Sequence, residues 1–113
     1  MKILMQDNIL PGEKMIHKFM NAKDLELDGI ELTSFDGVPL ENKVKEIEDA
    51  SRKSGMTVKV LCGGYKGWIG DFDDKMRQTA VNDIIDSMKT CKKIGIEGII
   101  APAAFGMHSN ALP

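Results

Sequence analysis

The sequence predicts an α/β fold with a parallel sheet, and two observations lead to this prediction. Short apolar runs begin near positions 2, 29, 57 and 97, so that they recur at intervals of roughly thirty residues. A segment with helical spacing of apolar residues fills each interval. Strands that alternate with helices in this way form right-handed crossovers between parallel strands. The 113 residues suffice for one small domain, and no linker or second domain interrupts them.

The first strand is expected at Lys2–Met5, where the chain opens with a short apolar run. Pro11-Gly12 interrupts the chain, and a helical pattern begins at Glu13. A second short strand is expected at Gly29–Leu32, directly after the Asp28-Gly29 break. The apolar side chains that define one face of the first helix are Met15, Ile16, Phe19 and Met20.

A second helix is expected over about Leu40–Ser54, and Gly55 is a typical stop signal for it. Charged side chains occupy its other faces, which indicates a solvent-exposed side. The third strand, Thr57–Cys62, is rich in β-branched residues. The apolar face of this helix is formed by Leu40, Val44, Ile47 and Ala50.

The third helix is expected to be the longest, beginning with Asp73 or Asp74 as its N-cap and ending at Gly95. The fourth strand follows at about Gly98–Ala101. Its apolar residues form a sustained stripe at helical spacing. The residues of this stripe are Met76, Ala80, Val81, Ile84, Ile85, Met88, Cys91 and Ile94.

Two architectures fit this β-α-β-α-β-α-β order. One is the N-terminal half of a (β/α)8 TIM barrel, with its helices on one face of the sheet. The other is a small open α/β sandwich with a parallel sheet and helices on both faces. A complete barrel typically needs about 250 residues, and this chain has 113.

Composition and charge exclude several classes of partner. The net charge is −2, and acidic residues interrupt the lysine-rich stretches, which argues against a nucleic-acid surface. The N-terminal apolar run is too short for a signal peptide or a membrane span. Cys62 and Cys91 form neither a CxxC pair nor a disulfide framework, as expected for reduced thiols. We therefore expect a cytoplasmic protein that binds neither nucleic acid nor membrane.

Glu31 is the first candidate for a binding role. Side chains alternate across a strand, so Ile30 and Leu32 share one face and Glu31 points to the other. A carboxylate on a sheet face is costly unless it is paired or hydrated. It lies near the carboxyl end of its strand, where active sites of α/β barrels are built. The alternative is a structural role, with Glu31 tied to neighbouring backbone or to a lysine.

The long loop after the third strand, "GGYKGWIGDFDD", supplies three further candidates, Tyr65, Lys66 and Trp68. These side chains either wall a site for a polar small molecule or pack the loop against the rim of the sheet. Gly63-Gly64 permits unusual backbone angles or a close approach of a ligand, but it matches no nucleotide-binding motif. Cys62 is expected to be a small buried residue rather than a nucleophile.

His108 follows the fourth strand and is the last substrate-binding candidate, whereas His17 is expected to have a surface or helix-packing role on the first helix. Glu31 and His108 give at most two metal ligands, and a catalytic divalent site usually takes three or more from protein. The residues alone therefore predict no metal site, and they identify no catalytic residue.

Four segments in this order resemble the sugar phosphate isomerase/epimerase family of xylose-isomerase-like TIM barrels. They are "MKI" at the first strand, "DGIEL" at the second, "DDKMRQTAVNDIIDSMKTCKKIGIEGII", and "APAAFG" after the fourth strand. The long segment resembles the family pattern through Arg77, Ala80 three residues later, and Gly95 before a strand. The resemblance spans about residues 1 to 106.

The resemblance implies a divalent-metal enzyme (Mn, Mg, Co or Zn) that moves a proton or hydride between adjacent carbons of a sugar or sugar phosphate. The family's main metal ligands and acid/base carboxylates lie on later strands, which have no counterpart here. The expectation is therefore a fragment of such an enzyme, inactive alone. A related branch, the abasic-site endonucleases, has histidines where this chain has Cys62-Gly63 and Pro102-Ala103, and is disfavoured.

Two other hypotheses follow from the residues. One is a half-barrel that associates with a second copy through its open sheet edges, because four unclosed parallel strands leave two edges unpaired. The other is a small, non-catalytic α/β binding module.

Overall fold

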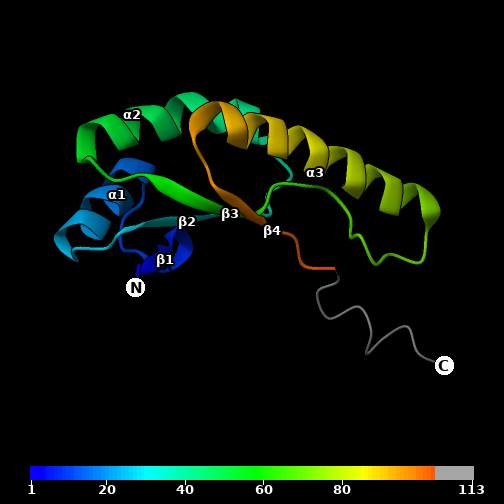
Figure 1. Cartoon of the computed structure of the whole chain (residues 1–113), viewed down its shortest axis with the longest axis horizontal. Helices are drawn as coiled ribbons and strands as arrows, with labels where there is room; N and C mark the ends of the chain where they lie inside the picture. Colours follow the sequence, from blue (N-terminus) through cyan, green and yellow to red (C-terminus); the bar gives the residue numbers. More distant parts are fainter. Residues whose placement is uncertain (104–113) are drawn as a thin grey trace.

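The computed structural model describes residues 1–103. Its elements, in chain order, are β1 (Leu4–Gln6), the 3-10 turn η1 (Asp7–Ile9), α1 (Met15–Asp24), β2 (Gly29–Ser34), the 3-10 turn η2 (Leu40–Lys43), α2 (Val44–Ser54), β3 (Val58–Gly63), α3 (Asp74–Ile94) and β4 (Gly98–Ile100). The predicted order of strands and helices is confirmed (Figure 1).

The strands form one parallel sheet in the order β1-β2-β3-β4. Neighbours in the chain are therefore neighbours in the sheet, and the carboxyl ends of all four strands meet at one edge. The register between β2 and β3 shifts at Ile30/Glu31, where Ile30 is opposite Val58 but Glu31 is opposite Val60. Loops that follow β2 and β3 are thus brought side by side.

Local signals in the sequence set the ends of the two longer helices. Gly55 and Gly95 have φ of 77° and 81°, a left-handed conformation that glycine adopts without strain. The Asp73 side chain accepts hydrogen bonds from the backbone N–H groups of Lys75 and Met76, so Asp73 rather than Asp74 is the N-cap. The predicted helix over Leu40–Ser54 begins instead with the 3-10 turn η2.

The helices pack on one face of the sheet around a single core. Every crossover is between adjacent strands and in the same direction, and right-handed crossovers of this kind place all helices on the same side. The described residues therefore leave the other sheet face without a helix. The core joins Phe19 and Ala22 of α1, Ile47 and Ala50 of α2, and Cys91 of α3 to Ile30, Leu32, Val58 and Leu61 of the strands.

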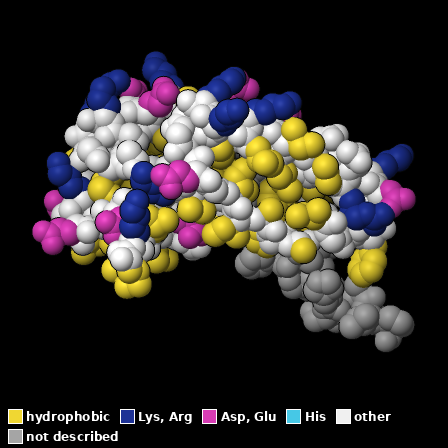
Figure 2. All heavy atoms as spheres, in the orientation of Figure 1, with side chains coloured by type: hydrophobic (Ala, Val, Ile, Leu, Met, Phe, Trp, Pro, Cys, Tyr) yellow, Lys and Arg dark blue, Asp and Glu magenta, His cyan; other side chains and the backbone are white. Residues whose placement is uncertain are grey.

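The apolar stripe of α3 is buried only in part. Ala80 and Cys91 are buried, but Val81, Ile85 and Met88 have exposed fractions of 36%, 45% and 57%. Figure 2 shows hydrophobic side chains at the surface over the half of the molecule that contains α3, while charged side chains dominate over α2. These three exposed residues lie on the side of α3 away from η2, and no described element covers that side.

The structure matches the small open α/β fold with a parallel sheet. It differs from the expected sandwich in one respect, because the described helices share one face. The half-barrel stays a prediction, since the described strands form an open sheet. No helix among residues 1–103 combines the length and the apolar character that crossing a membrane requires.

Candidate functional site

The candidate site lies at the edge of the sheet where β2 and β3 end. The backbone N–H of Gly64 donates to the carbonyl of Ser34 at 2.7 Å, which fastens the two loops together. Gly63 has φ of 90°, and a Cβ there would come within 2.6 Å of that same carbonyl. The expected unusual backbone angles of Gly63 and Gly64 are confirmed. The group that approaches Gly63 closely is the backbone of the neighbouring strand, where the sequence suggested a ligand.

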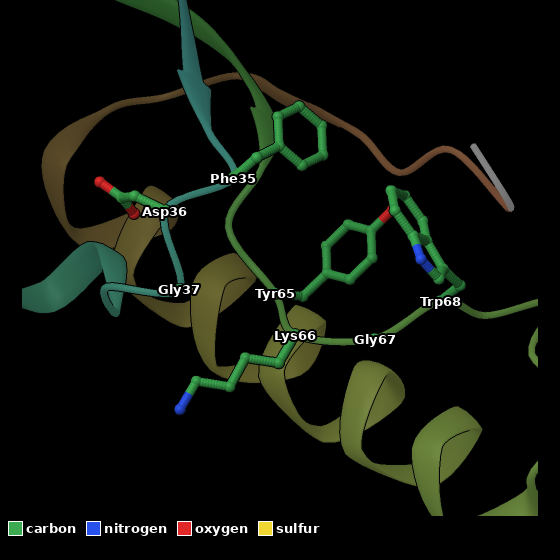
Figure 3. Close-up of a pocket in the computed structure, with 7 residues that line it drawn as sticks. All are labelled: Phe35, Asp36, Gly37, Tyr65, Lys66, Gly67 and Trp68. Atoms are coloured by element: carbon green, nitrogen blue, oxygen red, sulfur yellow. The ribbon is translucent and has the colours of Figure 1, made fainter. Parts of the chain in front are cut away.

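A pocket of about 590 Å³ opens between these two loops (Figure 3). Two of the aromatic side chains at the pocket meet edge to face, with the ring centroids of Tyr65 and Trp68 6.3 Å apart. The centroids of Phe35 and Trp68 are 6.4 Å apart. The residues that line the pocket are Phe35, Asp36, Gly37, Tyr65, Lys66, Gly67 and Trp68. Mostly apolar walls with a few polar groups are typical of small-molecule sites.

Tyr65 holds the loop in place as well as lining the pocket. Its hydroxyl donates to the backbone carbonyl of Pro102 at 2.6 Å, and only 8% of the residue is exposed. Burial, followed by the nearby Cys62, raises the pKa of Tyr65, so the phenol stays neutral at physiological pH. Tyr65 therefore packs the loop against the segment after β4, and its role in binding a small molecule stays a prediction.

Lys66 and Trp68 point in different directions from the same loop. The backbone N–H of Lys66 donates to a carboxylate oxygen of Asp83 on α3 at 2.9 Å. Figure 3 shows the Lys66 side chain extending away from the rings of Tyr65 and Trp68. The ammonium group is therefore at the margin of the pocket, and the aromatic rings form its wall.

Asp36 is already paired within the protein. Its carboxylate accepts hydrogen bonds from Lys43 Nζ at 2.6 Å and from the backbone N–H of Val38 at 3.0 Å. Lys43 Nζ also donates to the hydroxyl of Ser34 at 2.9 Å. The hydrogen bond from Lys43 holds the pKa of the Asp36 carboxyl below its ordinary value, so the group is ionised at neutral pH.

Glu31 lies outside the lining of this pocket, on the sheet face that no described helix covers. Its Oε1 accepts a hydrogen bond from the Gln6 amide at 2.7 Å, and β1 and β2 are thereby joined through side chains. The predicted orientation of Glu31 is confirmed, since Ile30 and Leu32 are buried and Glu31 is half-buried. The hydrogen-bond partner of Glu31 is the side-chain amide of Gln6, whereas the structural alternative predicted a backbone group or a lysine.

Cys62 is a buried residue near the carboxyl end of β3. It is 8% exposed, and burial followed by the negative charge of Glu31 raises its pKa. Cys62 in turn raises the pKa of Tyr65. A thiol with a raised pKa is a poor nucleophile, which agrees with the expectation of a small buried residue. Glu31, Cys62 and Tyr65 are thus close enough for the charge of one to influence the next, although neither Glu31 nor Cys62 lines the pocket.

A second carboxylate, Asp7, lies at the same end of the sheet as Glu31. One oxygen of Asp7 accepts hydrogen bonds from both the backbone N–H and the hydroxyl of Thr33, at 2.6 and 2.7 Å. The Lys18 ammonium lies 3.8 Å from the other oxygen of Asp7. This carboxylate therefore fixes the turn after β1 to the end of β2.

Sequence reasoning missed part of the site. Phe35, Asp36 and Gly37 stand in "TSFDGVP", which its composition identifies only as a loop. The available signal was position, because loops after adjacent parallel strands meet at one edge of the sheet. Of the predicted residues, the structure brings Tyr65, Lys66 and Trp68 together at the pocket and places Glu31 outside the pocket lining, on the open face of the sheet. His108 lies outside the described residues.

The metal implied by the family resemblance does not fit the described site. Within residues 1–103, no group of three or more histidine, cysteine, aspartate or glutamate side chains could hold an ion. Of the two ligand candidates, Glu31 is bonded to Gln6. No chemical step at this site is therefore derived through a metal.

No protein-family model matches the chain. Over 113 residues it is 36% identical to the 3-dehydro-D-guloside 4-epimerase of Escherichia coli strain K12. A crystal structure of the 3-keto-D-glucoside 4-epimerase YcjR from E. coli, in its apo form, is similar to the whole chain, with a TM-score of 0.83 and 36% identity. The chain spans 42% of the length of each of these proteins.

These comparisons correct the resemblance drawn from the sequence. The similar proteins are named for a dehydro-guloside and a keto-glucoside, neither a sugar phosphate nor xylose, and no family model supports the xylose-isomerase-like assignment. The motifs behind that assignment, such as a glycine between a helix and the next strand, follow from βα geometry. They report on a type of fold that many families share.

Proposed function

We propose that this chain binds an oxidised, unphosphorylated glycoside in a protein of the sugar-epimerase type. The observation that carries the proposal is the similarity of the whole chain, at 36% identity and a TM-score of 0.83, to a 3-keto-D-glucoside 4-epimerase. The pocket supports it, because aromatic rings at the carboxyl edge of a parallel sheet suit the apolar face of a pyranose.

The charges around the pocket favour a neutral sugar over a sugar phosphate. Phosphate sites usually combine several cationic side chains or the start of a helix. Lys66 is the one cation among the described lining residues, and its side chain extends away from the rings. Asp36 adds a negative charge at the same pocket, which opposes a phosphate. The proposed ligand class is therefore a keto-glycoside.

Glu31 is the carboxylate that we assign to the hydroxyl groups of the sugar. Gln6 occupies Oε1, and no described side chain is bonded to Oε2. The amide also fixes the orientation of the carboxylate, which is then ready to accept a hydrogen bond. Glu31 is on β2, and the aromatic pocket follows the carboxyl end of the same strand, so we propose that one glycoside contacts both.

The reaction class that we propose follows from the ligand named for the similar E. coli protein, a glucoside with a keto group at C3 that is epimerised at C4. Inversion at C4 beside a keto group at C3 requires removal of the proton from C4. The electron pair of the C4–H bond then moves toward the carbonyl and forms an enolate. The proton then returns to the opposite face of C4. The described residues offer binding groups for this chemistry but no cluster for a metal, so we expect no turnover by a single copy assayed with Mn²⁺, Mg²⁺ or Co²⁺.

Fluorescence tests the proposal directly, because Trp68 is the only tryptophan of the chain. A methyl 3-keto-glucoside should change the emission saturably, and glucose 6-phosphate should not. Phe35→Ala should weaken the binding about 2–10-fold, the effect of losing one aromatic contact. Phe72→Ala is the matched control, since Phe72 is exposed and does not line the pocket.

Two outcomes would overturn the proposal. One is tighter binding of glucose 6-phosphate than of the keto-glucoside. The other is an emission spectrum that the keto-glucoside leaves unchanged at concentrations where a control protein of the epimerase type, such as the E. coli relative, binds it.

A further inference from the structure

The loop between β3 and α3, residues 64–73, carries two of the three aromatic rings at the pocket and is called the aromatic loop below. Two side chains of α3 hold its backbone. The buried hydroxyl of Ser87 donates to the carbonyl of Gly64 at 2.6 Å. One turn earlier on the helix, a carboxylate oxygen of Asp83 accepts a hydrogen bond from the backbone N–H of Lys66 at 2.9 Å. The spacing of four residues places both side chains on the face of α3 that meets the loop.

Gly64 joins the aromatic loop to both of its neighbours. Its N–H donates to the carbonyl of Ser34 and its carbonyl accepts from Ser87, so this residue is bonded to the end of β2 and to α3. Gly64 has φ of 83°, and a Cβ there would come within 2.8 Å of a Leu61 methyl group and 3.1 Å of the Ser87 hydroxyl oxygen. Both the backbone conformation and the close approach of α3 therefore require glycine.

Other hydrogen bonds fasten the aromatic loop beyond Trp68. The backbone N–H of Gly70 donates to the carbonyl of Ala103 at 2.8 Å. The guanidinium of Arg77 donates to the carbonyl of Asp71 at 2.6 Å. Trp68 thus lies between the bonds to α3 and the bond at Gly70. A short segment that is held at both ends has few alternative conformations, so the position of this ring depends on both sets of bonds.

We propose that Asp83 and Ser87 are positioning residues for the ligand site. They hold the aromatic loop so that the rings of Tyr65 and Trp68 form the wall of the pocket, and neither of them is among the lining residues. The ligand is the keto-glycoside of the proposed function, on which this inference rests. A site that is already ordered binds more tightly, because less free energy is lost in ordering the loop. Loss of either hydrogen bond should therefore weaken binding.

The role of Asp83 can be tested apart from the stability of the helix. Asp83 is half-buried and lies inside α3, where alanine is the best helix former, so Asp83→Ala should not weaken the helix itself. Among the described residues, Asp83 forms no ion pair. Asp83→Asn keeps a side-chain oxygen that can accept from the Lys66 N–H but removes the charge. The pair of variants therefore separates the hydrogen bond from the negative charge.

The emission of Trp68 measures binding of methyl 3-keto-glucoside to each variant. Asp83→Ala and Ser87→Ala should each weaken binding about 2–10-fold, the effect of one ordinary hydrogen bond. Asp83→Asn should retain the affinity of the unmodified protein. Asp86→Ala is the matched control, since Asp86 is an exposed carboxylate of the same helix that pairs with Lys89 and forms no bond to the loop.

A second measurement needs no ligand. In the free protein, Asp83→Ala should increase the quenching of Trp68 by acrylamide and speed hydrogen exchange of the Lys66 amide, because this amide loses its partner. Asp83→Asn and Asp86→Ala should leave both rates unchanged. If the unmodified protein binds no keto-glucoside, the proposed function fails, and these rates alone then decide whether α3 holds the loop.

The inference is wrong if Asp83→Ala binds the keto-glucoside as tightly as the unmodified protein does. Where the unmodified protein itself does not bind, unchanged quenching and exchange in Asp83→Ala have the same meaning. It is also wrong if Asp83→Asn loses as much affinity as Asp83→Ala, because the charge and not the hydrogen bond would then be responsible. An equal loss in Asp86→Ala would indicate a general effect of removing charge from α3 and would contradict the assigned role.

Discussion

The two ends of the sheet use apolar residues in different ways. At one end, α1 and α2 lie side by side and bury Phe19, Ala22, Ile47 and Ala50 against the strands, each with no more than 4% exposure. At the other end, α3 buries Ala80 and Cys91 but leaves Val81, Ile85 and Met88 at the surface. An amphipathic stripe predicts burial only where the fold supplies a neighbour, and α3 has one on a single flank.

Core substitutions should show the largest contrast between the two ends. Phe19 is fully buried, so Phe19→Ala should lower the free energy of unfolding by about 3–5 kcal/mol through lost burial and a residual cavity. Ile85→Ala, at 45% exposure, should change it by less than about 1 kcal/mol in dilute protein. Urea denaturation of both variants at the same low concentration makes the comparison.

Equal losses in the two variants would contradict this contrast. They would mean that the side of α3 that carries Val81, Ile85 and Met88 is covered even in the monomer. A loss for Ile85→Ala that grows with protein concentration would instead indicate that this side is buried by association.

A smaller effect is expected from the start of α3. Asp73 accepts hydrogen bonds from Lys75 and Met76, and Asp73→Ala should lower the free energy of unfolding by about 1 kcal/mol. Asp73→Asn should restore most of the loss, because an amide oxygen also caps a helix. Thermal unfolding of both variants measures it, and a full loss in the asparagine variant would exclude capping as the cause.

The sequence predicted the order of the elements because the signals for it are local. Gly55, Gly95 and Asp73 act within a few residues of their own positions, and the structure confirms all three. The alternation of Ile30, Glu31 and Leu32 correctly placed Glu31 on the uncovered face. Each of these features depends on the backbone geometry of a short segment of four to six residues, so the local sequence is enough to predict it.

What sequence reasoning could not supply depends on pairing between distant segments. The contact of Glu31 with Gln6 spans 25 positions, and the contact of Tyr65 with Pro102 spans 37. The pocket itself requires the register between β2 and β3 and the bond from Gly64 to Ser34. Whether a neighbouring element covers each side of α3 is likewise a property of the assembled fold.

The two cysteines allow a finer comparison of the two faces of the sheet. Burial raises the pKa of both thiols, but only that of Cys62 is raised further by a carboxylate, Glu31. Glu31→Gln should therefore lower the pKa of Cys62 and speed its alkylation about twofold near pH 8. The rate for Cys91, measured in the same sample by peptide mass spectrometry, should stay constant. A parallel increase at Cys91 would indicate general loosening of the fold.

The smallest expected effect concerns Asp36 at the rim of the pocket. The hydrogen bond from Lys43 is the main reason that the pKa of Asp36 lies below its ordinary value. A carboxylate whose pKa is lower in the folded state stabilises the fold above its unfolded pKa, and this contribution disappears as pH falls through the folded pKa. In Lys43→Met the pKa of Asp36 should rise toward the ordinary value of about 3.9.

NMR titration of the Asp36 carboxyl measures the shift, and melts between about pH 6 and about pH 2 measure its link to stability. Lys43→Met should lose stability relative to the unmodified protein at about pH 6, and the difference should shrink toward about pH 2, where Asp36 is protonated in both. Lys45→Met is the control, because Lys45 has no ion pair among the described residues. A difference that persists at the acid end would show that Lys43 acts through its hydrogen bond to Ser34, and the Asp36 carboxylate would then be free to contact a ligand at the pocket.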